Sequence, residues 1–144
     1  IGRGDNQEVE RLQRISARLG VEGNVFFLGY LDGTSTSLIK QLDLLVVATR
    51  TFEGFGLTLA EAITVDTPIL VTRVGAIPEF IDESVGQLVS PGSPKEISYM
   101  LTDFIYNKSE WKKKTKLARQ RIHDVSSNMA EEYRKLFLEC NDEL

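Results

Sequence analysis

Short, continuous apolar runs alternate with segments of helical periodicity, and this alternation restricts the possible fold more than any other feature of the sequence. A strand that is apolar at successive positions is buried on both faces, as happens when helices cover both sides of a parallel sheet. The runs that we interpret as strands are 25–28, 44–47, 68–72 and, more weakly, 86–89. They predict an α/β fold with a doubly wound parallel sheet and C-terminal helices.

Helices are predicted between and after these runs. Asp5 or Asn6 can cap a helix that ends near Leu19, and Gly20 then provides a typical C-terminal stop. Pro94 suits the first turn of a helical region that begins near Ser93 and continues toward the C-terminus. Two shorter helices are predicted over 35–42 and 57–64.

The length and charge of the chain exclude several classes of protein. Its 144 residues fit one domain, and a net charge of −4 argues against a general nucleic-acid binder, which is usually strongly basic. No apolar run approaches the roughly 18 residues that predict a membrane span. The single cysteine, Cys140, predicts a reducing, cytoplasmic location. Because the chain begins on Ile1-Gly2 without an initiator Met, we expect a fragment that lacks the first strand or strands of its domain.

The segment from Glu53 to Glu61 carries the clearest chemistry. Gly54 and Gly56 precede the predicted helix 57–64, so the backbone can approach a ligand closely and the first N–H groups of the helix are free. Those donors and the positive end of the helix dipole suit a diphosphate. The helix rises about 7–8 Å between Gly56 and Glu61, so the two carboxylates can accept hydrogen bonds from hydroxyls at the two ends of such a ligand.

The position of this segment supports a binding role, although a simpler interpretation exists. The segment follows the predicted strand 44–47, and α/β sheets place their ligands at the carboxyl ends of parallel strands. A Gly-rich turn with two solvated glutamates explains the spacing alone equally well. The apolar neighbours of Glu61 favour the binding role, because an unpaired carboxylate is costly to bury.

This segment resembles the signature of two glutamates separated by seven residues in retaining glycosyltransferases of family 4, also called group 1, which have the two-domain GT-B fold. The resemblance extends over nearly the whole chain through further blocks in the same order. These blocks are Ile1-Gly2-Arg3-Gly4, 24–30, 42–47, 67–72, Gly75-Ala76-Ile77-Pro78-Glu79 and 86–92. It implies that residues 1–144 form the Rossmann-like, nucleotide-sugar binding half of such an enzyme, without the N-terminal acceptor domain.

The resemblance also implies roles for individual residues. Glu53 would be the catalytic residue, because it would hold the transferred sugar and stabilise positive charge at the anomeric carbon. Glu61 would accept from the ribose hydroxyls, and Tyr30 would contact the base, although partial burial explains Tyr30 equally well. The sugar and the distal phosphate would meet backbone groups of Gly54, Phe55, Gly56 and Leu57.

The family transfers the sugar from a nucleotide-sugar with retention of anomeric configuration and needs no metal or other cofactor. Three departures from its pattern affect local loop geometry: Asp66 and Ala76 replace glycines, and Arg50 or Thr49 stands where serine is usual. The family's diphosphate-binding Arg and Lys precede the first residue of this chain. We therefore expect the fragment to be inactive alone.

A basic stretch near the C-terminus raises the question of membrane contact. Many enzymes of this family act on lipid-linked acceptors, so peripheral binding to an anionic membrane is one interpretation and a solvated helix face is the other. The residues concerned are Trp111, Lys112, Lys113 and Lys114.

Two other functions remain as alternatives to the enzyme. A non-catalytic nucleotide-binding or interaction module of the same fold would explain Asp66 and Ala76, whereas the presence of both Glu53 and Glu61 argues against it. A dinucleotide-dependent oxidoreductase is disfavoured, because Gln7 occupies the position of the third glycine of its fingerprint.

Overall fold

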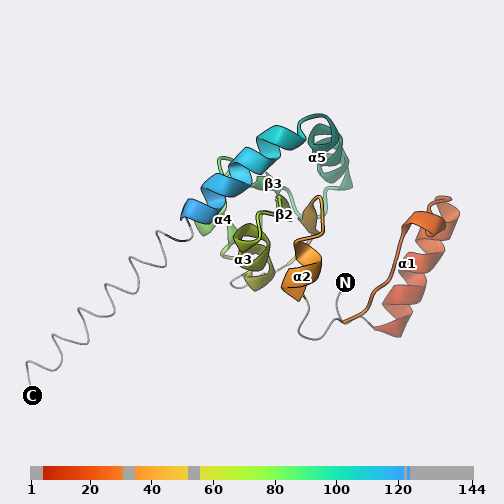
Figure 1. Cartoon of the computed structure of the whole chain (residues 1–144). Helices are drawn as coiled ribbons and strands as arrows, with labels where there is room; N and C mark the ends of the chain where they lie inside the picture. The colour runs from red at the N-terminus through yellow and green to blue at the C-terminus, as the bar shows by residue number, and fades with distance from the viewer. Residues whose placement is uncertain (1–4, 31–34, 52–55, 122, 124–144) are drawn as a thin grey trace, which may run out of the picture. The chain divides into compact units, whose positions relative to one another are not determined.

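The computed structural model describes residues 5–30, 35–51, 56–121 and 123 (Figure 1). The chain divides into two compact units, Ile1–Ser35 and Thr36–Leu144, and each is described by itself.

The first unit contains the predicted N-terminal helix. Helix α1 spans Asn6–Arg18, and the Asp5 side chain caps it by accepting a hydrogen bond from the Gln7 amide at 3.2 Å. Gly20 ends the helix with φ of +67°, and the Val21 amide donates to the Ser16 carbonyl at 3.0 Å. This is the glycine-dependent helix end expected from the sequence. A short 3₁₀ helix, η1, follows at Glu22–Asn24.

The prediction of a buried strand over 25–28 is wrong for the described part of the chain. Residues 25–30 have no regular secondary structure, and the Phe26 side chain is 75% exposed. A strand requires a hydrogen-bonded neighbour, and no other strand occurs among the described residues of the first unit.

The second unit contains the predicted parallel sheet. Its strands are β1 (Leu45–Val47), β2 (Ile69–Thr72) and β3 (Gln87–Val89), in the order β1-β2-β3 and all parallel. Each strand begins one residue later than predicted. In register, Val47 lies opposite Val71, and Thr72 lies opposite Val89.

Helices connect and follow these strands. Helix α2 (Ser35–Ile39) precedes β1 and is shorter than predicted, α3 (Leu57–Thr64) has the predicted bounds, and α4 (Ile77–Phe80) was not predicted. Helix α5 (Pro94–Tyr106) is capped by the Ser93 hydroxyl, with Pro94 in its first turn as expected. After Asn107 the chain is helical again over 108–121. No helix within the described ranges has the length and apolar character needed to cross a bilayer.

Both faces of the sheet are covered, which confirms the doubly wound arrangement. Along β2 the side chains of Ile69 and Val71 enter one apolar cluster, together with residues of α3 and α4 such as Leu59 and Ile77. The Leu70 side chain enters a second cluster on the other face. The remaining buried members of that second cluster are Val89, Phe104 and Trp111.

The helix 108–121, which we call the amino-edge helix, joins these two clusters. Its Trp111 side chain packs in the second cluster, and its Ala118 side chain belongs to the first. Trp111 also stacks edge-on against Phe104 with ring centroids 5.3 Å apart, and its indole N–H donates to the Asp103 carboxylate at 2.7 Å. This bond and one from the Asn107 amide hold the pKa of Asp103 below its ordinary value.

Three ion pairs attach the amino-edge helix to the loops that enter the strands. Each acceptor is an aspartate that precedes β1, β2 or β3, at the edge of the sheet where the strands begin. The pairs are Lys108 Nζ with Asp43 Oδ1 at 3.2 Å, Arg119 Nη1 with Asp66 Oδ2 at 2.9 Å, and Arg121 Nη1 with Asp82 Oδ2 at 2.5 Å. Lys108, Arg119 and Arg121 of this helix are therefore used inside the domain.

Candidate functional site

The candidate site lies where β1 ends and α3 begins, at the carboxyl edge of the sheet. The chain leaves β1 at Val47 and enters α3 through Gly56, which is buried and has φ of +64° and ψ of +42°. This left-handed conformation suits glycine, because a side chain there strains the backbone. Gly56 therefore allows the abrupt entry into α3.

The N-terminus of α3 presents backbone donors. The Gly56 carbonyl accepts from the amides of Leu59 at 2.8 Å and Ala60 at 3.1 Å, which closes the first turn. The amides of Leu57 and Thr58 come before those bonded groups, and among the described residues no side chain caps this helix end. The Leu57 residue at this helix end is 68% exposed. Amides without an acceptor inside the helix, together with the helix dipole, make this end suitable for an anion such as phosphate.

Glu61 lies in the second turn of α3. Its neighbours Ala62 and Ile63 are fully buried, whereas Glu61 is half-buried. The expected cost of burying this carboxylate is therefore smaller than the sequence suggested. Among the described residues no hydrogen bond or ion pair engages the carboxylate, so it is available to accept from a ligand hydroxyl.

The other predicted site residues divide into two groups. Glu53, Gly54 and Phe55 lie outside the described residues. Tyr30 belongs to the first unit, where its side chain is 60% exposed. Gly56, Leu57 and Glu61 are thus the predicted residues that one described unit holds together.

Sequence reasoning missed a buried threonine at the same edge of the sheet. Thr72, the last residue of β2, donates its hydroxyl to the Thr49 carbonyl at 2.6 Å. Thr49 lies in the chain between β1 and α3, so this bond reaches the start of the segment that leads to Glu53. A polar, β-branched residue ending an otherwise apolar run is the sequence signal for it.

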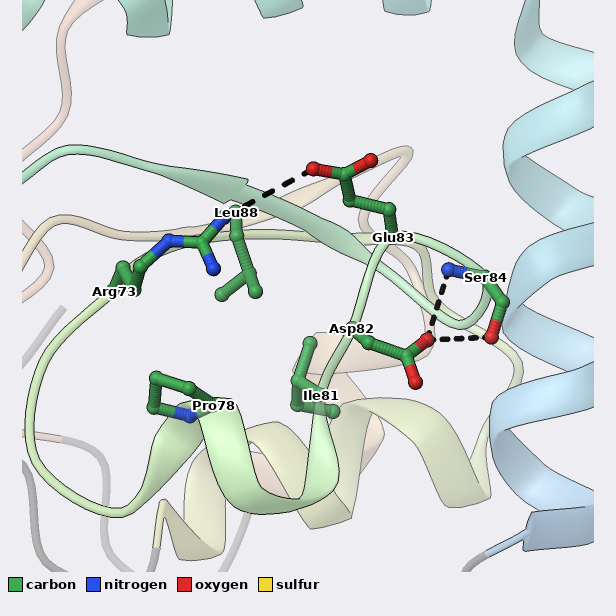
Figure 2. Close-up of a pocket in the computed structure, with 7 residues that line it drawn as sticks. All are labelled: Arg73, Pro78, Ile81, Asp82, Glu83, Ser84 and Leu88. Atoms are coloured by element: carbon green, nitrogen blue, oxygen red, sulfur yellow. Dashed lines mark hydrogen bonds and ion pairs between the residues drawn. The ribbon is translucent and has the colours of Figure 1, made fainter.

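A hollow of about 410 Å³ lies beside α4 and β3 (Figure 2). The Arg73 guanidinium reaches across it to the Glu83 carboxylate at 3.9 Å. Two carboxylates accompany this one cation, so the hollow is poorly suited to a diphosphate. Its lining residues are Arg73, Pro78, Ile81, Asp82, Glu83, Ser84 and Leu88.

The structure corrects the prediction that Trp111 contacts a membrane. Trp111 is 3% exposed and packs in the second apolar cluster, so it cannot insert into a bilayer while the domain is folded. Lys112 and Lys113 are exposed, and Lys113 pairs with Glu110 at 2.7 Å. Lys114 is half-buried.

No group of three His, Cys, Asp or Glu side chains that could hold a metal ion occurs in the described ranges.

Comparison with known families places this geometry in context. The family model described as "Glycosyl transferases group 1" matches residues 1–122. The chain belongs to this family. A group 1 domain from Francisella tularensis, the C-terminal domain of the protein LpcC, has the same fold at 27% identity and a TM-score of 0.74, covering 83% of this chain and 63% of that one. The fold is therefore that of a GT-B C-terminal domain.

Two further similar proteins are longer than this chain. An uncharacterized glycosyltransferase of Methanocaldococcus jannaschii, MJ1607, is 35% identical over 100 residues, which are 68% of this chain and 25% of that protein. HepE of Anabaena, solved in complex with UDP, is 25% identical with a TM-score of 0.76, covering 93% of this chain and 39% of that one. The chain thus spans a quarter to two fifths of these relatives.

Proposed function

We propose that this chain is the donor-binding domain of a glycosyltransferase that transfers a sugar from a nucleotide-sugar to an acceptor. The observation that carries the proposal is the open N-terminus of α3, entered through the left-handed Gly56, with the unengaged Glu61 carboxylate in the next turn. This arrangement lies inside the segment that the group 1 family matches. The complex of HepE with UDP supports a nucleoside diphosphate as the ligand class.

The chemistry of transfer explains each feature. As the bond between the anomeric carbon and the diphosphate oxygen breaks, negative charge grows on the leaving diphosphate. The amides of Leu57 and Thr58 and the α3 dipole stabilise that charge. Glu61 accepts hydrogen bonds from the ribose hydroxyls and orients the nucleotide. Glu53 stabilises positive charge on the sugar, and the oxygen of the acceptor hydroxyl bonds to the anomeric carbon with retention of its configuration while its proton passes to the leaving diphosphate.

Titration of this chain with UDP, GDP, ADP and UDP-glucose tests the proposal. We expect Glu61→Ala to weaken nucleoside diphosphate binding about tenfold or more, because a charge-assisted hydrogen bond is lost. Glu53→Ala should leave UDP binding unchanged and weaken UDP-glucose binding. Glu10→Ala, which removes an exposed carboxylate on α1, is the matched control and should bind like the wild type.

Two results would contradict parts of this proposal. Failure of the wild-type chain to bind any of the four ligands at millimolar concentration would contradict a donor-binding role for this chain. We also propose that binding requires no metal, so affinities measured with EDTA and with Mg²⁺ should agree. A marked loss of affinity in EDTA would contradict metal independence while leaving the donor-binding role intact.

We further propose a cytoplasmic location, with peripheral contact at an anionic membrane through the lysines of the amino-edge helix. The exposed Lys112 and Lys113 support this proposal, because lysine side chains attract anionic headgroups without insertion into the bilayer.

A further inference from the structure

Thr72 ends the central strand of the sheet with a fully buried hydroxyl. The residue is 1% exposed, and its Oγ1 lies 2.6 Å from the Thr49 carbonyl oxygen and 3.4 Å from the Val47 carbonyl oxygen. A hydroxyl has one proton to donate, and the shorter contact identifies Thr49 as its main acceptor. Because threonine is β-branched, its side chain holds this direction with little rotamer freedom.

This bond extends the attachment of β1 to β2 beyond the strand ladder. The ladder ends where Val47 lies opposite Val71, and the Thr49 carbonyl comes two residues later. On the other side of β2, the Arg73 amide donates to the Val89 carbonyl at 2.8 Å. Residues at the end of β2 are therefore hydrogen-bonded to the segments on both sides of the strand, and Thr72 makes the bond on the β1 side.

We propose that Thr72 is a positioning residue for donor binding. Its hydroxyl fixes the point at which the connection between β1 and α3 leaves the sheet, and Gly56 fixes the point at which that connection enters α3. This inference rests on the proposed function, because the connection ends at Gly56, directly before the Leu57 and Thr58 amides that are proposed to bind the diphosphate. Thr72 itself contacts no part of the donor and acts through the Thr49 backbone.

The segment that enters β2 offers a matched control. Thr67, two residues before β2, is 2% exposed, and its hydroxyl donates to the carbonyl of Ile39, the last residue of α2, at 2.8 Å. Thr67 and Thr72 thus each make one hydrogen bond from a buried hydroxyl to the backbone carbonyl of another segment. They lie at opposite ends of β2, and Thr67 lies away from the candidate site.

The experiment compares Thr72→Val, Thr72→Ser and Thr67→Val in this chain. Valine keeps the branched shape and removes the hydroxyl, whereas serine keeps the hydroxyl. We expect Thr72→Val to weaken UDP and UDP-glucose binding about tenfold, the change equivalent to one hydrogen bond. Thr72→Ser should restore affinity to near the wild-type value, and Thr67→Val should leave it unchanged. Urea unfolding of each variant shows whether the two valine variants lose similar stability.

Hydrogen–deuterium exchange provides a readout that does not depend on the donor. We expect faster exchange in peptides covering 48–57 for Thr72→Val and in peptides covering 36–43 for Thr67→Val. If the wild type binds no nucleotide, the proposed function fails, and the exchange pattern still decides whether Thr72 anchors this segment. If Thr72→Val does not fold, Thr72→Cys replaces it, since a thiol is a weak donor of similar size.

Three outcomes would overturn the inference. The first is equal affinity for UDP-glucose in Thr72→Val and the wild type. The second is equal loss in Thr72→Val and Thr67→Val, which would indicate a general loss of stability. The third is failure of Thr72→Ser to restore binding, which would assign the effect to the methyl group.

Discussion

Asp66 shows how a single residue can depart from a family pattern and still adopt the backbone conformation that glycine favours. The corresponding position in the resembling block is glycine, and Asp66 adopts φ of +61°, the left-handed conformation that glycine favours. Aspartate tolerates this region better than most residues, and its carboxylate gains the ion pair with Arg119. Ala76 has φ of −80° and ψ of −4°, which require no glycine. Neither substitution therefore argues for a non-catalytic module.

Replacing Asp66 by glycine and by alanine separates the backbone cost from the ion pair. Both variants lose the pair with Arg119, and only alanine carries the steric cost of the left-handed conformation. We expect the free energy of unfolding of Asp66→Ala to be about 1–2 kcal/mol lower than that of Asp66→Gly, as measured by urea denaturation. Equal stability of the two variants would show that the backbone at residue 66 relaxes away from positive φ.

For single residues, contacts between neighbours in the sequence could be predicted, whereas contacts between residues far apart in the sequence could not. Asp5, Gly20 and Pro94 act within a turn of their own position, so local sequence identifies them. The Thr72 hydroxyl and the Thr49 carbonyl are 23 residues apart, and the partners Asp82 and Arg121 are 39 apart. Local sequence does not indicate which segments will form such long-range hydrogen bonds, because their partners come together only in the folded domain.

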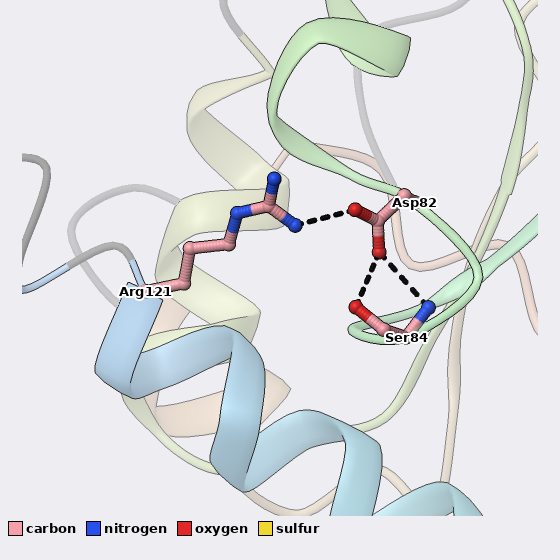
Figure 3. A network of polar contacts seen from close by, with 3 residues as sticks. All are labelled: Asp82, Ser84 and Arg121. Carbon is pink, nitrogen blue, oxygen red and sulfur yellow. Dashed lines mark hydrogen bonds and ion pairs between the residues drawn. The ribbon is translucent and has the colours of Figure 1, made fainter.

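The amino-edge helix depends on charges at the element scale. At its end Arg121 bonds to Asp82, and the amide and hydroxyl of Ser84 donate to the same carboxylate (Figure 3). The bond from the Ser84 hydroxyl, followed by that from Arg121, lowers the pKa of Asp82 from 3.8 to about 2. The charged form of Asp82 thus stabilises the loop between α4 and β3 and its contact with the helix.

This lowered pKa predicts a loss of stability in acid. Because the pKa of Asp82 is lower in the folded state, its contribution is complete above the ordinary value of 3.8 and is lost as pH falls toward about 2. We expect the urea midpoint to fall more steeply over this range in the wild type than in Asp82→Asn. Other carboxylates titrate in both proteins, so the difference between them isolates Asp82.

Two further variants identify the cause of the shift. The Ser84 hydroxyl is the largest single cause of the lowered pKa of Asp82, and Arg121 lowers it both by a hydrogen bond and by its charge, so Ser84→Ala and Arg121→Gln should each flatten the pH dependence. An unchanged pH dependence in both variants would contradict this account.

Two kinds of element could be predicted from the sequence. They are apolar strands that helices cover on both faces, and helices long enough to show a helical periodicity of apolar residues. The runs at 44–47, 68–72 and 86–89 became the parallel sheet, because each has helices to cover it. The run at 25–28 is also apolar, but no other strand occurs among the described residues of its own unit. Helix α4 has four residues, which is too short to produce a helical period, and Pro78 in its first turn is its main local signal.

At the scale of the whole molecule, the candidate site and the amino-edge helix occupy opposite edges of one sheet. Gly56, Leu57 and Glu61 belong to the carboxyl edge, whereas Lys108, Arg119 and Arg121 meet the loops that enter the strands. These three cations thus lie away from the proposed phosphate site at the start of α3. The proposal of donor binding came in outline from the segment between the two glutamates, and the separation of the two edges required the sheet topology.

Vesicle binding tests the remaining membrane prediction on the intact domain. Trp111 is the one tryptophan in the sequence and is buried, so its fluorescence reports on the core. We expect the chain to sediment with anionic vesicles at low salt without a change in Trp111 emission, and to be released at high salt. Lys112→Gln with Lys113→Gln should abolish sedimentation, and neutral vesicles are the control.

Two results would contradict this expectation in different ways. Absence of binding to anionic vesicles at low salt would end the membrane prediction. A shift of Trp111 emission on binding would show that the second apolar cluster opens at the membrane.

The amino-edge helix also has a consequence for how the domain is made. Synthesis proceeds from the N-terminus, so β1, β2 and β3 leave the ribosome before residues 108–121 do. Until then Leu70 and Val89 lack Trp111 as a partner, and the three aspartates that precede the strands lack their cations. The sheet is therefore completed by a helix that is made after all three strands, and a nascent chain that pauses before Trp111 exposes apolar surface to chaperones and to other chains.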